Sequence, residues 1–201
     1  MLHFHYTKAM LRKTILFLMM LLLITASGLY GQTTASEYRE RAREKYRQAD
    51  YDGAIAEATK AIELDPAFAE TYTYRGIVHY VKKEYADAMV DFERSIEIDP
   101  KYSEAYFYRG TLRYLKKDSD GAIADWTKAI DLGSATPYFH RGTLRFMKKD
   151  YDGAIADFTK AIQIFPDITA YRLERAKVYR AVGKIDLAKA DEEKVAEMEK
   201  P

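Results

Sequence analysis

The sequence predicts an all-α fold in which antiparallel helix-turn-helix repeats stack side by side. Three observations lead to this prediction. A twelve-residue stretch recurs from residues 51, 85, 119 and 151, which gives periods of 34, 34 and 32 residues. Within each copy, apolar residues recur at intervals of three and four, the period of one helix face. A second helical pattern precedes each copy, so every period holds two helices, as in a stacked repeat array.

Composition allows one domain and excludes several classes of function. The chain has 201 residues, a formal net charge of +1 and no cysteine. A balanced charge does not predict a nucleic-acid partner, because binding a polyanion requires a basic surface. The lack of cysteine excludes disulfides, thiolate nucleophiles and cysteine-ligated metal sites.

Residues 1–31 have the pattern of a targeting segment. Arg12 and Lys13 precede an apolar run over residues 15–24, and small residues follow at 25–28. This order is typical of a secretory signal peptide, so we expect an exported protein that is periplasmic or secreted. The alternative is an uncleaved N-terminal anchor that contacts the membrane and holds the remaining domain outside the cytoplasm, since the apolar region reaches the short limit of a bilayer span.

A short polar lead-in over residues 32–34 is followed by a repeat domain over residues 35–201. The repeat windows are 35–68, 69–102, 103–134, 135–168 and 169–201. The third window is two residues shorter than those around it and ends in Gly133-Ser134 in place of an acidic residue and proline. We therefore expect a looser or differently angled junction near residues 133–137.

The second helix of each repeat is clearest in residues 151–162. Ala154, Phe158 and Ala161 recur along one face of this helix. Asp150 stands at its start, where a carboxylate caps free N–H groups and favours the positive end of the helix dipole. A proline follows its last turn and ends it. The link to the preceding helix is short, so the two helices fold back as an antiparallel pair.

Small residues recur where the two helices of a repeat must approach closely. The eighth position of each window holds Ala42, Gly76, Gly110, Gly142 and Ala176, and the twentieth holds Ala54, Ala88, Ala122, Ala154 and Ala188. A glycine within a helix costs about 1 kcal/mol relative to alanine, so its recurrence requires a packing reason. We expect a larger side chain at the eighth position to overpack the helix pair.

At these positions the chain resembles the tetratricopeptide repeat family. It shares tyrosine at the fourth position, glycine or alanine at the eighth, alanine at the twentieth and twenty-seventh, an aromatic residue at the twenty-fourth and proline at the thirty-second. The resemblance covers residues 35–201 and implies a right-handed α-solenoid of about five repeats. It also implies that the first helices line a concave groove that takes a peptide or a partner's helix. Chaperone-binding members hold a C-terminal carboxylate with lysine and asparagine, and this chain has no asparagine.

The resemblance implies that positions two, five, nine, twelve and thirteen of each first helix face the groove. The candidate protein-binding residues are Arg39, Arg43, Tyr46, Thr73, Ile77, Tyr80, Phe107, Thr111, Tyr114, Phe139, Thr143 and Phe146. The thirteenth position adds Val81, Leu115 and Met147. Such a groove is basic at both ends and apolar-aromatic in the middle. Its aromatic row either anchors a partner or only packs neighbouring repeats together, and the sequence leaves both alternatives open.

A charge pattern also recurs with the repeat. Position seven is arginine in every window, and position twenty-three is acidic: Glu57, Asp91, Asp125, Asp157 and Asp191. In an antiparallel pair these positions lie at one level, which predicts an Arg–carboxylate bridge between the two helices. The alternative is a pair within the second helix, to the basic residue three places on. As an exposed pair, such a bridge contributes only about 0–1 kcal/mol.

No catalytic, metal-binding or cofactor-binding residues are predicted. His79 and His140 occupy different repeat positions and are expected to be isolated, each of them structural or exposed. Histidines at zinc-protease spacing, a phosphate-binding glycine loop and a G-x-S-x-G element are all lacking. The acidic residues recur with the repeat, which favours a scaffold role. We therefore expect a non-enzymatic, exported adaptor that binds a protein or peptide partner in cell-envelope assembly; the alternative is a self-associating structural protein, a homo-oligomer without a dedicated ligand.

Overall fold

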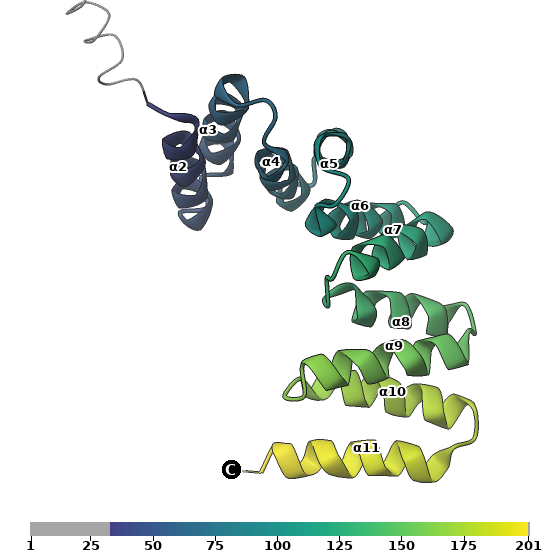
Figure 1. Cartoon of the computed structure of the whole chain (residues 1–201). Coiled ribbons are helices and arrows are strands. Elements are labelled where there is room, and N and C mark those ends of the chain that lie inside the picture. Colours follow the sequence, from purple (N-terminus) through teal and green to yellow (C-terminus); the bar gives the residue numbers. More distant parts are fainter. Residues whose placement is uncertain (1–32, 201) are drawn as a thin grey trace, which may run out of the picture.

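The computed structural model describes residues 33–200, and every regular element in this range is an α-helix. In chain order the helices are α2 (Ala35–Arg47), α3 (Tyr51–Leu64), α4 (Ala69–Val81), α5 (Tyr85–Ile98), α6 (Ser103–Leu115), α7 (Ser119–Asp131), α8 (Pro137–Met147), α9 (Tyr151–Ile164), α10 (Thr169–Ala181) and α11 (Ile185–Met198). They follow one another along a curved stack (Figure 1), which confirms the predicted all-α repeat solenoid. The predicted targeting segment, residues 1–31, lies outside the described residues. Over 33–200, no helix has the length and apolar character that a membrane span requires.

Each repeat is one antiparallel helix pair, and each pair packs on the next. Within a repeat α2 packs on α3, α4 on α5, α6 on α7, α8 on α9 and α10 on α11. The second helix of each repeat also packs on the first helix of the following one. Neighbouring first helices touch directly as well, because α4 contacts α6 and α8 contacts α10. We call the surface that the first helices α2, α4, α6, α8 and α10 form the first-helix face.

The recurring glycine lets the two helices of a repeat approach closely. A Cβ atom on Gly76 would lie 2.7 Å from the ring of Phe92, and one on Gly110 would lie 2.9 Å from the ring of Trp126. Both rings are buried, so neither can move aside without disturbing the core. The predicted packing reason for glycine at the eighth position is confirmed by this geometry.

The helix ends follow the sequence signals. The side chains of Asp50, Asp118 and Asp150 each accept a hydrogen bond from a glycine N–H three residues later, at 2.9–3.0 Å. These bonds satisfy free N–H groups at the starts of α3, α7 and α9. In the long second helices the helix ends two residues before the proline, as at Leu64 in α3. In α3 and α9 a local signal therefore marks both ends of the helix.

The shortened third repeat changes its junction with the fourth. Helix α7 ends at Asp131, and Gly133 adopts a left-handed conformation with φ of 93° that favours glycine. Helix α8 then begins at Pro137 and has 11 residues, whereas the other first helices have 13. Helix α7 has 13 residues and α8 has 11, one and two fewer than their counterparts, whereas the connection over residues 132–136 is one residue longer than the connection over 65–68. The stacking of α7 on α8 is kept.

A ladder of buried Arg–Asp pairs joins the two helices of four repeats. The guanidinium of Arg141 donates to both carboxylate oxygens of Asp157, with Nε–Oδ2 and Nη2–Oδ1 distances of 2.9 and 2.7 Å. The same two-bonded geometry joins Arg75 to Asp91, Arg109 to Asp125 and Arg175 to Asp191. Asp157 is 2% exposed and Arg141 is 8% exposed. The cross-helix prediction is confirmed here, but the assumption of an exposed pair is wrong, because the carboxylates lie inside the helix pair.

The ladder also links successive repeats. The third guanidinium nitrogen, Nη1, donates to a threonine hydroxyl of the preceding repeat at 2.9–3.0 Å, in the pairs Arg75–Thr59, Arg141–Thr127 and Arg175–Thr159. Each such arginine therefore holds three helices together. Stability in a repeat array depends on the interfaces between neighbours, so this bond supports cooperative folding.

The first repeat follows the alternative pairing. Glu57 accepts a hydrogen bond from Lys60 on its own helix at 2.9 Å, and the other Glu57 carboxylate oxygen is buried without a partner among residues 33–200. Arg41 instead lies over the ring of Tyr38, 5.4 Å from its centre. Glutamate is one methylene longer than aspartate, so its carboxylate does not occupy the place that the arginine fork requires. The cross-helix prediction is therefore wrong for this repeat.

Candidate protein-binding face

The predicted groove residues lie on the first-helix face, but they differ widely in exposure. Thr73 is 1% exposed, and its hydroxyl donates to Ser95 at 2.8 Å inside the helix pair. Thr73 therefore does not line an open surface. The partly buried members are Arg39, Arg43, Tyr46, Ile77, Tyr80, Phe107, Thr111, Phe139, Thr143 and Phe146. Tyr114 is the exposed member, at 38%.

Most rings of the aromatic row pack within their own repeat. The ring of Tyr46 lies 5.5 Å from that of Tyr51, Tyr80 lies 5.9 Å from Tyr85, and Phe146 lies 6.0 Å from Tyr151. Each partner is the first residue of the second helix. Their centre distances lie within the range of about 4.5–7 Å that aromatic pairs prefer. These three rings therefore pack within their own repeats, whereas the packing alternative expected contacts between neighbouring repeats; Tyr46 also makes such a contact, with Tyr74 at 6.2 Å.

Tyr114 differs because its repeat lacks the tyrosine partner. Ser119 stands where the neighbouring repeats have Tyr85 and Tyr151. The ring of Tyr114 contacts Trp126 instead, at 6.0 Å, and its hydroxyl lies 3.8 Å from the sulfur of Met147 on the next repeat. Its exposure and its contact across the repeat boundary make it the aromatic residue best placed for a partner.

Restoring the tyrosine is expected to stabilise the third repeat. In Ser119→Tyr, the new ring can pack on Tyr114 as the rings of its neighbours do, and such a pair contributes about 0.5–1.5 kcal/mol. A thermal unfolding experiment should show a Tm that is about 2–4 °C higher. Ser119→Ala is the matched control, with an unchanged Tm. Equal Tm values for both variants would contradict the packing account of the row.

Exposed apolar side chains form a stripe at the C-terminal ends of three successive first helices. The stripe consists of Val81 on α4, Tyr114 and Leu115 on α6, and Met147 on α8. Met147 is 62% exposed, Leu115 46% and Val81 37%. The contact between Tyr114 and Met147 makes the stripe continuous across one repeat boundary. We call these four residues the apolar stripe; exposed apolar surface of this kind marks interaction sites.

The basic ends of the predicted groove are already neutralised. Arg39 pairs with Asp65 at 3.2 Å, Arg43 with Glu70 at 2.5 Å, and at the other end Arg180 bonds both oxygens of Glu192 at 2.6–2.9 Å. The basic residues at both ends of the predicted groove are therefore held in ion pairs. The physical reason is that carboxylates on the same or the adjacent repeat lie within reach of each guanidinium.

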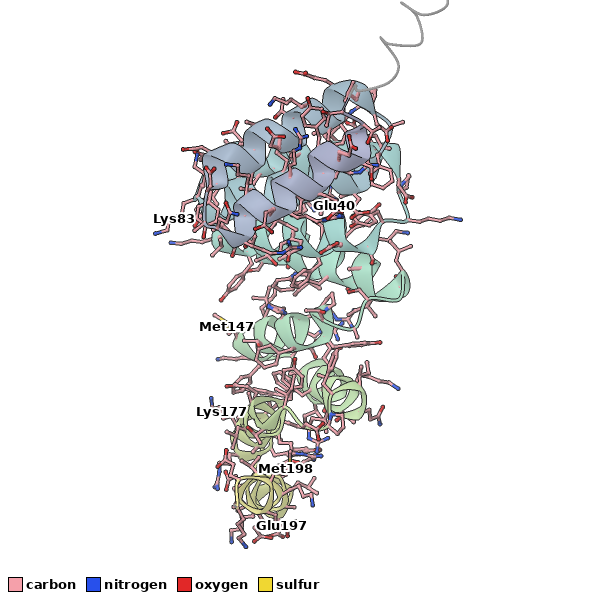
Figure 2. All side chains as sticks on the ribbon, turned by 90° about the vertical axis from the view of Figure 1, so that its left-hand side faces the viewer. Glu40, Lys83, Met147, Lys177, Glu197 and Met198 are labelled. Atoms are coloured by element: carbon pink, nitrogen blue, oxygen red, sulfur yellow. The ribbon has the colours of Figure 1, made fainter. Side chains whose placement is uncertain are left out.

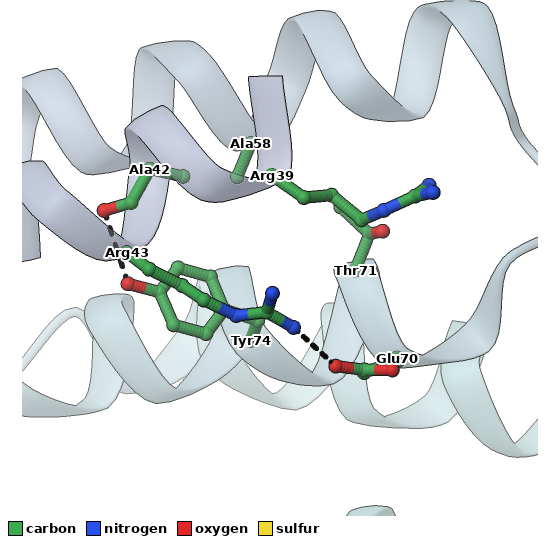
Figure 3. Close-up of a pocket in the computed structure, with 7 residues that line it drawn as sticks. All are labelled: Arg39, Ala42, Arg43, Ala58, Glu70, Thr71 and Tyr74. Carbon is green, nitrogen blue, oxygen red and sulfur yellow. Dashed lines mark hydrogen bonds and ion pairs between the residues drawn. The ribbon is translucent and has the colours of Figure 1, made fainter. Parts of the chain in front are cut away.

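A small pocket lies between the first two repeats (Figure 3). Its walls include Arg39, Arg43, Glu70 and Tyr74, and its cavity volume is about 10 Å³. This is about the space that one water molecule needs, so the pocket is too small for a small-molecule ligand. Burial raises the pKa of Tyr74 to about 12, so its hydroxyl stays protonated and donates to the carbonyl of Ala42 at 3.1 Å. The pocket thus carries hydrogen bonds that hold the repeats together.

His79 has charged neighbours, so the expectation of an isolated histidine is wrong. Its Nδ1 lies 2.7 Å from Glu84, and one ligand atom each of His79, Glu84 and Asp87 lie within 4.8 Å of one another. Glu84 also pairs with Lys82 at 2.5 Å. Corresponding positions in other repeats hold arginine and aspartate, as in the pair of Arg145 with Asp150. His79 therefore stands at the position that arginine occupies in the third and fourth repeats.

His140 should make the protein sensitive to mild acid. Its ring lies among three aromatic rings, with centre distances of 5.1 Å to Phe107, 5.7 Å to Trp126 and 5.8 Å to Phe139. Burial lowers the pKa of His140. Its ordinary pKa is about 6.5, so below that pH the unfolded chain binds more protons and the native state loses stability. The Tm should fall between about pH 7.5 and about pH 5.5, and His140→Phe should reduce this fall; an equal fall in both proteins would contradict the assignment.

Three protein-family models with the same description match the sequence of this chain. Each is described as a tetratricopeptide repeat, and they cover residues 39–103, 92–124 and 135–168. The chain belongs to the tetratricopeptide repeat family. This result confirms the resemblance seen in the sequence, and the ladder and the apolar stripe are features of this particular tetratricopeptide repeat chain.

Several solved structures resemble most of this chain. A crystal structure of MamA is 25% identical, with a TM-score of 0.71 over 82% of this chain and 91% of that chain. YrrB, whose structure is described as that of a TPR protein with an unusual peptide-binding site, is 20% identical, with a TM-score of 0.67 over 87% and 91%. PilF of Pseudomonas aeruginosa is 16% identical, with a TM-score of 0.74 over 83% and 77%. Comparison with curated protein sequences finds no significant match.

Proposed function

We propose that this protein is a non-enzymatic scaffold or adaptor whose first-helix face binds a peptide or a helix of another protein. We also propose that it works outside the cytoplasm, in the assembly of the cell envelope. The second statement is supported by the order of basic, apolar and small residues in the first 31 positions. The first is supported by the fold and by the surface of the described residues.

The observation that carries the binding role is the apolar stripe. A soluble helix face normally keeps large apolar side chains inside, and clustered exposed ones mark interaction sites. Here they occur in register on three successive repeats, at the same position of each first helix. The likeness to YrrB, a protein described as having a peptide-binding site, supports the same role.

Co-purification of the full chain from its native cells tests the role. We expect a partner to be retained by wild type and lost in a double variant, Tyr114→Glu/Leu115→Glu. Val90→Glu is the matched control, because Val90 is 64% exposed on α5, a second helix. A partner retained equally by all three proteins would contradict binding through the first-helix face.

Self-association is the second candidate, and the last helix favours it. Ile185 and Leu187 on α11 are 41% and 48% exposed. The counterparts of Ile185 in the second and fourth repeats, Tyr85 and Tyr151, pack against Leu112 and Val178 of the following repeats. Analytical ultracentrifugation of the full chain separates the two candidates. Concentration-dependent dimers that disappear in Ile185→Glu/Leu187→Glu would support self-association, and a single monomeric species would support the adaptor.

A further inference from the structure

We propose that the apolar stripe and the lysines beside it dock an amphipathic helix whose apolar face is flanked by carboxylates. This inference rests on the proposed function, because it names the kind of partner that the same first-helix face accepts. It goes further because it assigns binding to the C-terminal ends of the first helices and specifies an acidic, amphipathic partner. Three observations carry it: unpaired lysines, their backbone conformation and the chemistry of the stripe.

Two lysines follow each thirteenth-position residue of the stripe directly in sequence. They are Lys82 and Lys83 after Val81, Lys116 and Lys117 after Leu115, and Lys148 and Lys149 after Met147. Figure 2 shows Lys83 and Met147 on the same side of the molecule. The six lysines therefore directly follow the C-terminal ends of α4, α6 and α8, next to the stripe residues in the chain.

Two of these six lysines have partners within the protein. Lys82 pairs with Asp52 of the preceding repeat at 2.6 Å, and Lys148 pairs with Asp120 in the same way. The equivalent of these two aspartates in the second repeat is Ala86. Lys116 consequently has no carboxylate within 4.0 Å in the described part of the chain.

The remaining three lysines stand at a position where the backbone itself favours glycine. Lys83, Lys117 and Lys149 have φ values of 64°, 66° and 63°, and the corresponding residue of the last repeat is Gly183. A non-glycine residue in this conformation costs about 1–3 kcal/mol. All three are exposed, and none pairs with a carboxylate within residues 33–200. Neither the backbone conformation nor an ion pair explains why lysine occupies this position. We therefore assign its role to the positive charge that it gives the surface.

Two aspartates that follow these lysines in the chain already make hydrogen bonds and ion pairs with other groups. They therefore neutralise the positive charge of the lysines only in part. Asp118 caps α7 and lies 3.9 Å from Arg113, and Asp150 caps α9 and lies 3.5 Å from Arg145. The unpaired charges next to the stripe are therefore mainly positive. A partner that covers the stripe meets them with the best complementarity when its own flanks are acidic.

The stripe itself favours a helical partner. Its surface consists of apolar side chains and one tyrosine hydroxyl, which lies against the sulfur of Met147. An extended peptide laid on it would bury backbone N–H and C=O groups without partners, and that costs free energy. A helix satisfies its own backbone and presents only side chains. Methionine adapts its shape to such partners.

The distance between neighbouring first helices also suits a helical partner. Packed helices lie about 8–10 Å apart, and α4 and α6 are in direct contact. Seven residues of a helix rise about 10.5 Å. An apolar residue repeated every seventh position of the partner thus comes into register with successive stripe residues. About 18 residues, or about 27 Å of helix, cover all three repeats.

A designed peptide pair tests the proposal. Both peptides have about 18 residues and the same leucine stripe at i, i+3, i+4 and i+7; one is flanked by glutamate and the other by lysine. Each is labelled with fluorescein and titrated with the full chain, and binding is read as fluorescence anisotropy. We expect the glutamate peptide to bind at least tenfold more tightly than the lysine peptide, and added salt to weaken it.

Variants locate the site. Met147→Glu should weaken the glutamate peptide at least tenfold, whereas Val90→Glu, at a site of equal exposure on α5, should not. Lys83→Glu/Lys117→Glu/Lys149→Glu should invert the preference between the peptides. The matched control is Lys101→Glu/Lys128→Glu/Lys160→Glu, which makes the same charge change elsewhere. Equal binding of both peptides, or no effect of Met147→Glu, would overturn the proposal.

Two further outcomes separate this proposal from neighbouring ones. Vesicles of anionic phosphatidylglycerol that bind wild type better than Met147→Glu, with no binding of the glutamate peptide, would overturn it in favour of a lipid surface. Native partners lost in Tyr114→Glu/Leu115→Glu, together with no preference between the peptides, would overturn the acidic helix and leave the proposed function standing. Tight binding of the glutamate peptide that Met147→Glu abolishes supports the proposal.

Discussion

Leucine in place of Gly142 is expected to lower the free energy of unfolding by about 3 kcal/mol, the upper end of the usual cost of overpacking a core. A Cβ atom at this position would lie 3.1 Å from the Cβ of Asp157 and 3.1 Å from the ring of Phe158. The further atoms of leucine would have to enter the interface of α8 and α9. Chemical denaturation of the full chain measures the change, and the Tm should fall by about 10 °C.

Alanine at the same position is the control. Ala42 and Ala176 occupy the eighth position in the first and last repeats and are fully buried, so a single methyl group fits between the helices there. Gly142→Ala should therefore cost much less than Gly142→Leu. If the leucine variant unfolds at the wild-type denaturant concentration, the close approach of the two helices does not hold the repeat together.

Removal of the Asp157 carboxylate is the second change with a large expected effect. In Asp157→Ala, Arg141 and Arg145 lose three hydrogen bonds of 2.7–2.9 Å. Arg141 is then a buried charge without its partner, and breaking a buried pair in this way costs about 3–5 kcal/mol. The expected loss is far larger than for an exposed pair, and denaturant unfolding of the variant measures it.

A comparison with a surface pair shows whether burial is the cause. Lys194 and Glu197 pair at 2.9 Å on α11 with both side chains more than half exposed. Glu197→Ala should change stability by only about 0–1 kcal/mol. A double-mutant cycle on Arg141 and Asp157 isolates their coupling. Coupling as small as that of the surface pair would contradict the buried ladder.

The fold could be predicted from the sequence because its signals are local and repeated. The apolar period, the capping aspartates such as Asp150 and the prolines after the second helices act within one turn of the chain, and they occur in several copies. The positions of arginine and aspartate in the ladder could be predicted from the antiparallel geometry alone. The burial of Asp157 could not, because it depends on how α8 and α9 tilt as they pack.

The binding face could be predicted only in part. Its location on the first helices followed from the family resemblance, but the exposure of each side chain depends on neighbours that are distant in sequence. Thr73 is covered by contacts with Ser95, whereas Met147 stays open. Tyr114 is more exposed than Tyr80, and the sequence contains the reason, because Ser119 replaces the tyrosine that packs on the ring. This reason becomes visible only when the contact between Tyr80 and Tyr85 is known.

Site-specific photocrosslinking in native cells tests most directly whether the first-helix face is the binding surface. A photoreactive amino acid replaces Met147 on α8 in one protein and Val90 on α5 in another, and the two sites are 62% and 64% exposed. The account predicts that illumination joins position 147, but not position 90, to a different polypeptide. Adducts from position 90 alone, or equal adducts from both positions, would contradict it.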